Sequence, residues 1–390
     1  MIKRLFFTAV FCLLAIFLLA QADSLYLLLP QFSNPFYDTF SRNYIGSTSA
    51  GRGYTGVSVL GGLDNALLNP ASVLPDSAKF FIEMNIKPSL EAEGYPLYAN
   101  YTSPFPLGLL GLSFAVENKF SLGVLYNLPK SITLNDYSFF INQGADLIQR
   151  FPVYNLHQAT ALIAFHNGPL HLGLNLHNQF HYIDDPIFLR SYERIRDSQY
   201  HLRFQPGIIY QLGSANIGFS MMPATKFSWN LKCANYDFKM PLWLTGGIEF
   251  VKPEFTLATE AEWEQTSDIC DSFNDRFTFK AGLEKMSDKL VYRLGYHFTS
   301  NVYSGMIRLA QNVVNPDTSN AWNTVPQAVF IEDNAQHSLT AGLSYRFKNG
   351  IFNLSAMQVI LGDVNKTQIN LSLCFYLNYI FRKREIHLNE

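Results

Sequence analysis

The sequence predicts an all-β protein, a closed antiparallel transmembrane β-barrel of about 14 strands (14 or 16) with an N-terminal plug inside its lumen. Charged residues make up only 15% of the 390 residues, against about 25% in soluble proteins. Apolar side chains recur at every second residue to the end of the chain. Short turns also alternate with long connections, as in outer-membrane barrels. A mean hydropathy of +0.03 excludes a disordered chain and a bundle of membrane helices.

The first 22 residues resemble a secretory signal peptide. Lys3 and Arg4 precede an apolar run over 5–20, and Ala20-Gln21-Ala22 has the small-x-small pattern of a cleavage site. The alternative is a permanent N-terminal anchor, but the run is shorter than the roughly 20 residues that span a bilayer. We therefore expect export of the chain and removal of 1–22.

The strand signal is a strict alternation of apolar and polar residues. Leucine occupies every second position from 170 to 176, and an apolar residue occupies every second position from 369 to 381. Alternation places the apolar side chains on one face of an extended strand, whereas a helix would scatter them around its axis. A soluble β-sandwich or propeller also alternates, but these segments are longer than the usual strand of about five or six residues.

The alternating pattern divides the second part of the chain into fifteen segments. Because a bacterial barrel has an even number of strands, one segment is wrong, and we expect the error among the first four, which leaves 14 or 16. The segments are 79–88, 95–102, 107–116, 120–127, 156–166, 169–182, 200–211, 214–222, 241–251, 254–264, 276–286, 289–310, 336–348, 351–361 and 367–381.

The connections between segments are of two kinds. Asn167-Gly168 and Asn349-Gly350 are two-residue hairpin signals, because their residues tolerate positive φ. Short turns at one end of a barrel and long loops at the other are typical of outer-membrane proteins. The long connections are 128–155, 183–199, 223–240, 265–275 and 311–335.

Residues 23–75 do not alternate, and they contain the most distinctive local sequence of the chain. It runs Gly51-Arg52-Gly53-Tyr54-Thr55-Gly56, followed by Asp64-Asn65-Ala66 and Asn69-Pro70-Ala71. The three glycines match the dinucleotide fingerprint G-x-G-x-x-G, but that fingerprint needs a buried strand before it and a helix after it, which are not indicated here. Glycines at this density instead suit a compact plug whose backbone lies close against a wall.

This motif, just ahead of the first strand, resembles the N-terminal hatch of the FadL/TodX family over about 46–73. The resemblance implies a fourteen-stranded outer-membrane channel for long-chain fatty acids and other hydrophobic molecules. The PorV/PorQ group, which is tied to type IX protein secretion, has a similar N-terminal pattern and is the nearest alternative. The hatch residues implied in this way are Gly51, Arg52, Gly53, Tyr54, Gly56, Asp64, Asn69, Pro70 and Ala71.

The expected organisation is a signal peptide over 1–22, a hatch or plug over 23–75, a transmembrane barrel over 76–381 and a polar C-terminal tail over 382–390. The hatch could be a static plug that completes the interior packing, or a gate that moves. The sequence leaves both open, because it reports fit rather than motion.

The connection 128–155 is unusually apolar for a segment expected to face water. A short helix with an exposed apolar side could form a capture groove for hydrophobic ligands. Alternatively, the same side chains could pack onto the barrel mouth or onto lipopolysaccharide. The candidate capture loop consists of Tyr137, Phe139, Phe140, Ile141, Leu147, Ile148 and Phe151.

No pattern in the sequence supports a catalytic, metal or cofactor site. His171, His177 and His181 share one strand face, but at about 3.3 Å per residue they are too far apart to ligate one zinc ion. The glutamates at 260, 262 and 264 form an acidic row that suits a polar lumen. The chain has no G-x-S-x-G elbow and no P-loop, so we expect no enzyme, and an outer-membrane lipase is an unsupported alternative.

The function that we expect is passive uptake of hydrophobic small molecules across the bacterial outer membrane, by a monomer that contacts outer-membrane lipid and an apolar ligand. One alternative is a PorV-like component that binds a secreted protein. Another is a general porin for polar solutes, which a plug argues against. The near balance of 29 basic and 31 acidic residues excludes nucleic acid as a partner. Cys233 and Cys270 could form a disulfide, but the spacing does not decide it.

Overall fold

The computed structural model describes residues 46–86, 106–133, 136–142, 144–150, 153–185, 195–231, 234–269, 273–302, 304–314, 322–332, 335–362 and 367–377. The proposed signal peptide, the C-terminal tail, Cys233 and Cys270 lie outside these residues. Among the described residues, no helix is both long enough and apolar enough to cross a membrane.

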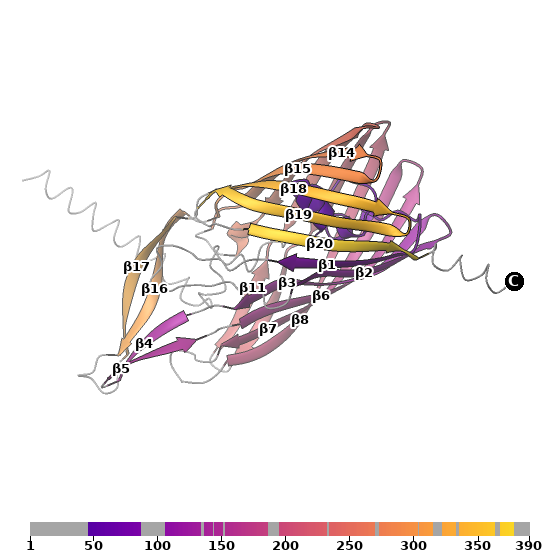
Figure 1. Ribbon diagram of the computed structural model, residues 1–390. Helices are drawn as coiled ribbons and strands as arrows, with labels where there is room; N and C mark the ends of the chain where they lie inside the picture. Colours follow the sequence, from indigo (N-terminus) through magenta and orange to yellow (C-terminus); the bar gives the residue numbers. More distant parts are fainter. Residues whose placement is uncertain are drawn as a thin grey trace, which may run out of the picture.

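Fourteen strands form a closed barrel, and each pairs antiparallel with the next (Figure 1). The first strand pairs with the last, with Lys79 opposite Tyr376. The strands are β1 (Lys79–Ile86), β2 (Leu107–Val116), β3 (Phe120–Thr133), β6 (Val153–Asn167), β7 (Leu170–Asp185), β8 (Ile195–Leu212), β9 (Ala215–Met222), β12 (Trp243–Val251), β13 (Phe255–Glu264), β14 (Arg276–Ser287), β15 (Leu290–Thr299), β18 (Gln336–Phe347), β19 (Gly350–Leu361) and β20 (Thr367–Tyr376). This confirms the predicted closed barrel and fixes the strand number at fourteen.

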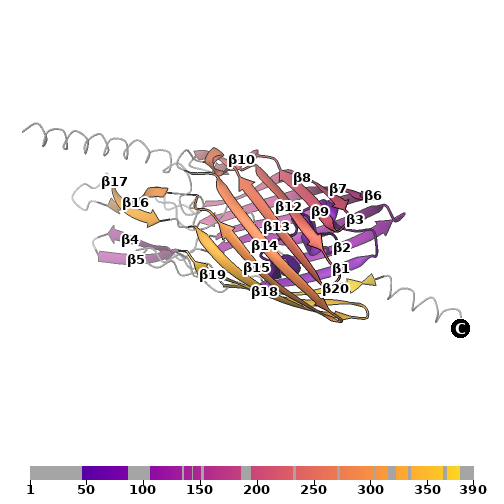
Figure 2. The same ribbon diagram turned by 90° about the horizontal axis from the view of Figure 1, so that it is seen from above.

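Three further hairpins belong to the long connections and pair only within themselves. They are β4–β5 (Asp136–Asn142 and Gly144–Arg150), β10–β11 (Thr225–Leu231 and Ala234–Met240) and β16–β17 (Ser304–Val314 and Trp322–Glu332). Figures 1 and 2 show β4–β5 and β16–β17 projecting beyond one end of the barrel, opposite the end with the short turns. The long connections at that end therefore carry strands of their own.

Two segment predictions need comment. The segment 95–102 lies outside the described residues, and the fourteen described strands close without it because β1 pairs directly with β2. The segment 289–310 is not one strand: β15 ends at Thr299 and β16 begins at Ser304 in a separate sheet. The alternation of apolar and polar residues continues into β16, because a hairpin outside the barrel also alternates. Only the strand pairing therefore separates β15 from β16.

Both predicted hairpin turns exist, but each is displaced by one residue. The β6–β7 turn lies at Gly168-Pro169 and the β18–β19 turn at Lys348-Asn349. Gly168 has φ 57°, which glycine adopts without strain. Gly350 begins β19 instead, where a Cβ would lie 2.1 Å from the carbonyl oxygen of Cys374, so its role is close approach of two backbones.

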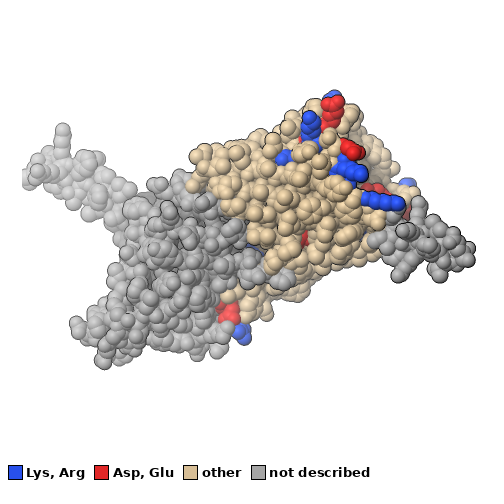
Figure 3. All heavy atoms as spheres, viewed as in Figure 1, with Lys and Arg blue, Asp and Glu red and all other residues tan. Residues whose placement is uncertain are grey.

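The outer face of the barrel is apolar and the inner face is polar, as the alternation predicts. In β7, Leu172 and Leu174 are exposed, whereas His171 and His177 are buried. On the face shown in Figure 3, most of the charged atoms of the described residues gather near the end with the short turns, and a broad band beside them carries almost none. This band is the part of the wall that faces lipid in a transmembrane barrel.

A charge placed on this band tests the assignment of the two faces. Leu294, near the middle of β15, is 62% exposed, and we expect Leu294→Arg to lower the free energy of unfolding by about 2–4 kcal/mol in a bilayer. Ser287→Arg, at the exposed end of β14 beside a short turn, is the control and should cost less than about 1 kcal/mol. Denaturant unfolding in liposomes measures both, and equal effects would contradict the assignment.

Candidate functional site

The N-terminal residues 46–73, here called the plug segment, pack against the inner face of the barrel. They contain the short helix α3 (Ser47–Gly51) and the 3-10 turns η2 (Asp64–Leu67) and η3 (Pro70–Ser72). Figures 1 and 2 show this segment in indigo within the ring of strands. Almost all of its residues are buried, which requires partners for a largely irregular backbone.

Two glutamates of the wall accept hydrogen bonds from backbone N–H groups of the plug segment. Glu260 of β13 accepts from Gly56 and from Val57. Glu83 of β1 accepts from Gly46 at 3.1 Å and from Ser47 at 2.6 Å. Hydrogen bonds to a carboxylate are stronger than those between neutral groups, so the two glutamates fasten the segment at two separate points.

Neutral side chains hold the segment elsewhere along its length. Thr340 of β18 accepts from the N–H of Gly53 at 2.8 Å and donates to Gly51 O at 3.2 Å. Gln205 of β8 donates to the carbonyl oxygens of Leu67 and Leu68, at 3.1 and 3.0 Å. The segment is therefore bonded to strands on several sides of the barrel.

Two further wall contacts have the same form. Asn175 of β7 donates to Ala66 O at 2.8 Å, and His166 Nε2 lies 2.7 Å from Val73 O. These bonds hold η2 and the residue that follows η3.

Asn69 explains the Asn-Pro-Ala motif. Its Oδ1 accepts from the N–H of Ala71 at 3.0 Å and caps η3, with Pro70 at the first position of the turn, where the missing N–H costs nothing. Its Nδ2 donates to Val57 O at 2.6 Å within the segment and lies 3.1 Å from Ile208 O of β8. One side chain thus caps a turn, crosses the segment and reaches the wall.

Arg52 is the buried cation of the motif. Its Nη1 lies 3.8 Å from Glu249 of β12 and 3.7 Å from Glu284 of β14. Glu284 also accepts from Arg293 Nε at 2.6 Å. Removal of one partner from a buried group of this kind leaves a charge uncompensated and is strongly destabilising.

Other motif residues make contacts that stabilise the fold of the plug segment itself. Asp64 accepts from the N–H of Thr48 at 3.1 Å and from its hydroxyl, so it joins η2 to α3. Tyr54 has φ 63° and is 2% exposed, with its ring 5.5 Å from that of His297 in an edge-on contact. All nine predicted hatch residues therefore lie in one buried segment, although nothing in their positions shows whether it moves.

Wall glycines let the plug backbone approach the barrel, and the sequence analysis did not select them as site residues. A Cβ on Gly207 would lie 1.9 Å from Asn69 Oδ1, and one on Gly218 would lie 2.1 Å from Val57 O. The signal was present in the sequence as glycine on the polar face of successive strands. The wall glycines in contact with the segment are Gly111, Gly173, Gly207, Gly218, Gly247, Gly282, Gly295 and Gly342.

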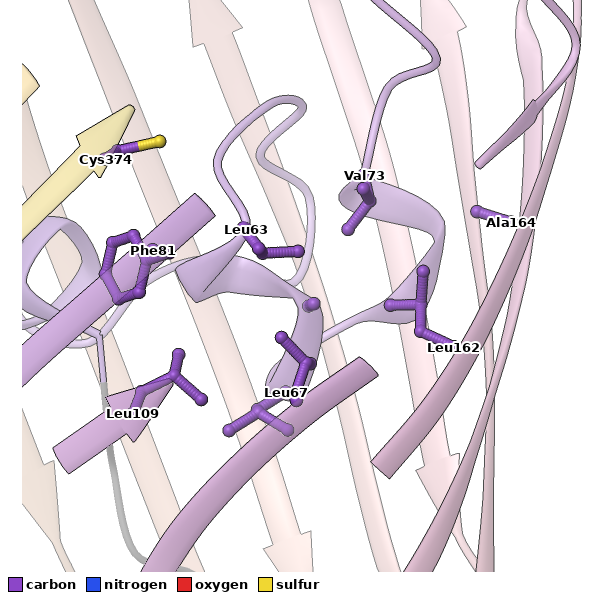
Figure 4. Close-up of a cluster of buried hydrophobic side chains, with 10 residues drawn as sticks. Leu63, Leu67, Val73, Phe81, Leu109, Leu162, Ala164 and Cys374 are labelled. Carbon is purple, nitrogen blue, oxygen red and sulfur yellow. The ribbon is translucent and has the colours of Figure 1, made fainter. Parts of the chain in front are cut away.

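One side of the plug segment is apolar. Figure 4 shows Leu63, Leu67 and Val73 among inward side chains of neighbouring strands. The complete cluster is Leu63, Ala66, Leu67, Val73, Phe81, Leu109, Leu125, Leu162, Ala164 and Cys374. The segment thus has a hydrogen-bonded side and an apolar side.

The β10–β11 hairpin lies against the inner face of the wall. Arg203 of β8 donates to Pro223 O at 3.1 Å and to Pro241 O at 2.9 Å, the residues on either side of the hairpin. The guanidinium of Arg203 also lies 4.9 Å from the centre of the Trp243 ring. The Phe227 ring contacts the ring of His181 at 4.3 Å. The base and the body of the hairpin are both fixed to the wall.

The candidate capture loop differs from its prediction. Residues 136–150 contain the β4–β5 hairpin rather than a short helix. The side chains of this hairpin and the whole of Phe151 lie outside the described residues. The expected short helix was therefore wrong, because the backbone forms a hairpin here. The capture role stays a prediction.

The histidines of β7 hydrogen-bond to neighbouring strands. His177 contacts Thr160 Oγ1 at 2.8 Å and Gln205 Oε1 at 2.9 Å, and His181 contacts the hydroxyl of Tyr154 at 2.8 Å. Within the part of the chain that the structure describes, no three His, Cys, Asp or Glu side chains are grouped so that they could hold a metal ion.

Several solved structures have a fold similar to that of this chain. The toluene transporter TbuX of Ralstonia pickettii matches with a TM-score of 0.63 at 14% identity, over 86% of this chain and 98% of that one. A FadL homologue of Pseudomonas aeruginosa gives 0.59 at 13%, over 85% and 98%. The toluene transporter TodX of Pseudomonas putida gives 0.60 at 14%, over 86% and 98%.

No family model matches the sequence, and no curated protein is similar to it in sequence. At 13–14% identity, the likeness is one of fold. The barrel therefore has the FadL/TodX-type fold that the hatch motif suggested. With its apolar outer face, it is a barrel of the bacterial outer membrane.

Substitution of a wall glycine tests the close fit of the plug segment. In Gly218→Ala, the new methyl group would collide with the backbone of Val57 and Ser58, and overpacking of this kind costs about 1–3 kcal/mol. We expect a displaced segment and a higher single-channel conductance in planar bilayers. Gly246→Ala on the neighbouring strand β12 is the control, because its Cβ has open space. Equal conductance in the two variants would contradict the fit.

Loss of a wall carboxylate tests the backbone bonds. Glu260→Ala removes the acceptor for the N–H groups of Gly56 and Val57, and an unsatisfied buried donor costs about 1–3 kcal/mol. We expect amide hydrogen exchange at these two residues to become at least about tenfold faster. Thr256→Ala, at a buried position of the same strand, should leave both rates unchanged. Unchanged exchange in Glu260→Ala would refute the role of this carboxylate.

Proposed function

We propose that the protein is a passive outer-membrane channel for hydrophobic small molecules, gated by the plug segment. The observation that carries the proposal is a barrel of the FadL/TodX-type fold whose interior holds a buried segment fastened to the wall. The solved structures of the same fold include two toluene transporters and a FadL homologue. A segment buried inside the lumen also disfavours a general porin, because a porin needs an open path for polar solutes.

Uptake would begin when an apolar molecule leaves water at the long-loop end. Transfer into an apolar environment releases roughly 0.8 kcal/mol per buried CH₂ group, so no coupled energy source is needed. The candidate capture loop connects β3 to β6 at this end of the barrel. Passage would then require the plug segment to shift.

The contacts of the plug segment favour a gate that opens by displacement rather than by unfolding of the barrel. The strands bond to one another through their backbones, whereas the segment is bonded mostly by single side chains such as Glu260, Thr340 and Gln205. These side-chain bonds can be exchanged for water one at a time. A shift of the segment would thus leave the barrel ladder intact.

Uptake by cells tests the function. We expect a host without its own hydrophobic channel to take up radiolabelled toluene or palmitate faster when it produces this protein. Sucrose entry should stay at the background rate, because the plug segment closes the lumen to polar solutes. Absence of accelerated entry for both apolar probes would exclude the proposal. Copurification of a secreted protein, without uptake, would instead favour the PorV-like alternative.

Replacement of Arg52 tests whether the plug segment gates the lumen. Arg52→Met removes the cation beside Glu249 and one of the two cations beside Glu284, and breaking a buried ion pair costs about 3–5 kcal/mol. We expect a loosened segment, with sucrose entry several-fold above background and faster toluene entry. Arg346→Met, at an exposed position near a short turn, is the matched control and should behave as the natural protein does. A tight lumen in Arg52→Met would contradict gating by this segment.

A further inference from the structure

Two histidines face each other across the β6–β7 hairpin. His166 and His171 are directly opposite partners in the strand register, one residue pair before the turn at Gly168-Pro169. Both side chains lie on the inner face of the barrel and are buried, at 8% and 5% exposed. Their Nδ1 atoms lie 2.5 Å apart, and their ring centroids lie 4.8 Å apart. The hairpin therefore directs two imidazole nitrogens to one point.

The other nitrogen of each ring faces an acceptor, which fixes the position of the ring hydrogen. His166 Nε2 lies 2.7 Å from Val73 O, and because a carbonyl oxygen only accepts, this nitrogen carries the hydrogen. His171 Nε2 lies 3.2 Å from Gln211 Oε1, which accepts in the same way. A neutral imidazole has one N–H and one lone pair. Each Nδ1 atom therefore presents its lone pair to the other ring.

Two lone pairs that face each other at this distance repel unless a cation lies between them. Neutral imidazole is the commonest metal ligand in proteins. A ligating histidine usually donates its other ring N–H to a carbonyl or carboxylate group, which fixes the tautomer and orients the ring. Val73 and Gln211 provide this arrangement for both rings. The pair therefore has the donor atoms and the outer hydrogen bonds of a two-histidine metal site.

We propose that His166 and His171 bind one divalent transition-metal ion of the kind that prefers imidazole ligands, such as Zn²⁺. Tetrahedral zinc with Zn–N bonds of about 2.0–2.1 Å requires the two nitrogens to move from 2.5 Å to about 3.3 Å apart. No third His, Cys, Asp or Glu of the described residues joins the pair as a ligand, so water completes the coordination. The turn residues 167–169 are exposed, and the ion enters from this end.

With a metal bound, the site ties the β6–β7 hairpin to the end of the plug segment. Val73 follows η3 and precedes β1, and it accepts from His166. A cation on Nδ1 withdraws electron density from the ring, so Nε2–H becomes a stronger donor to this carbonyl group. Asp76, 52% exposed and bonded to Lys79 at 2.7 Å, acts on His166 electrostatically. Its negative charge favours a cation at this place.

Titration calorimetry with ZnCl₂ tests the site on the full chain, folded in detergent and freed of metal with a chelator. We expect the natural protein to have a zinc site that is lost in both His166→Gln and His171→Gln. Gln211→Ala keeps both Nδ1 atoms but removes the outer acceptor of His171, and it should weaken binding at least about tenfold. Mg²⁺ should not occupy the site, because it prefers oxygen ligands.

His201→Gln is the matched control, because it removes an inward histidine that bonds to Thr225 instead, and it should keep the natural affinity. Saturating zinc should also raise the unfolding temperature of the natural protein but not that of the two pair variants. The inference is overturned if the natural protein binds no zinc, or if the pair variants bind it as tightly as His201→Gln does. Heat-modified migration on gels establishes that each variant is folded, and Gln211→Ala decides if neither pair variant folds.

Discussion

Burial of an irregular backbone inside a barrel is the constraint on which the rest of this structure depends. The plug segment has only a short helix and two 3-10 turns, so most of its N–H and carbonyl groups cannot bond to one another. Buried backbone groups need partners, and the wall supplies them through inward side chains such as Glu83, Glu260 and Gln205. The polar lining of this lumen is therefore a set of partners for a particular segment.

The same constraint explains the wall glycines. A hydrogen bond of 3.1 Å from the short side chain of Asn69 to Ile208 O of β8 requires the plug backbone to lie almost against the strands. Side chains on the strands would prevent this approach at Gly207 and Gly218, where a Cβ would fall within 2.1 Å of the segment. Close packing of this kind has low compressibility, so the plug segment fits the wall in one arrangement along this side.

The two ends of the barrel are built differently for a physical reason. At one end, short turns close the strand pairs, and residues such as Gly168 with positive φ allow a tight return. At the other end, β3, β6, β7 and β8 extend beyond the neighbouring strands, since β8 pairs with β9 only from Gly207 onward. Arg203 then ties the β10–β11 hairpin to the inner face of this taller wall. Molecules that approach from the long-loop end meet the hairpins before they meet the plug segment.

The sequence by itself determined the barrel, the two faces of its strands and the position of the buried segment's motif, because alternation and glycine content are local properties of the chain. It did not determine the strand number or the end of β15 at Thr299, since a hairpin outside the barrel alternates in the same way as a wall strand. Only the tertiary structure brought Arg52 to Glu249 and Glu284, and Leu63 to the apolar side chains of Phe81, Leu109, Leu125 and Leu162. These partners are far apart in the chain, and strand register and barrel closure decide which of them meet.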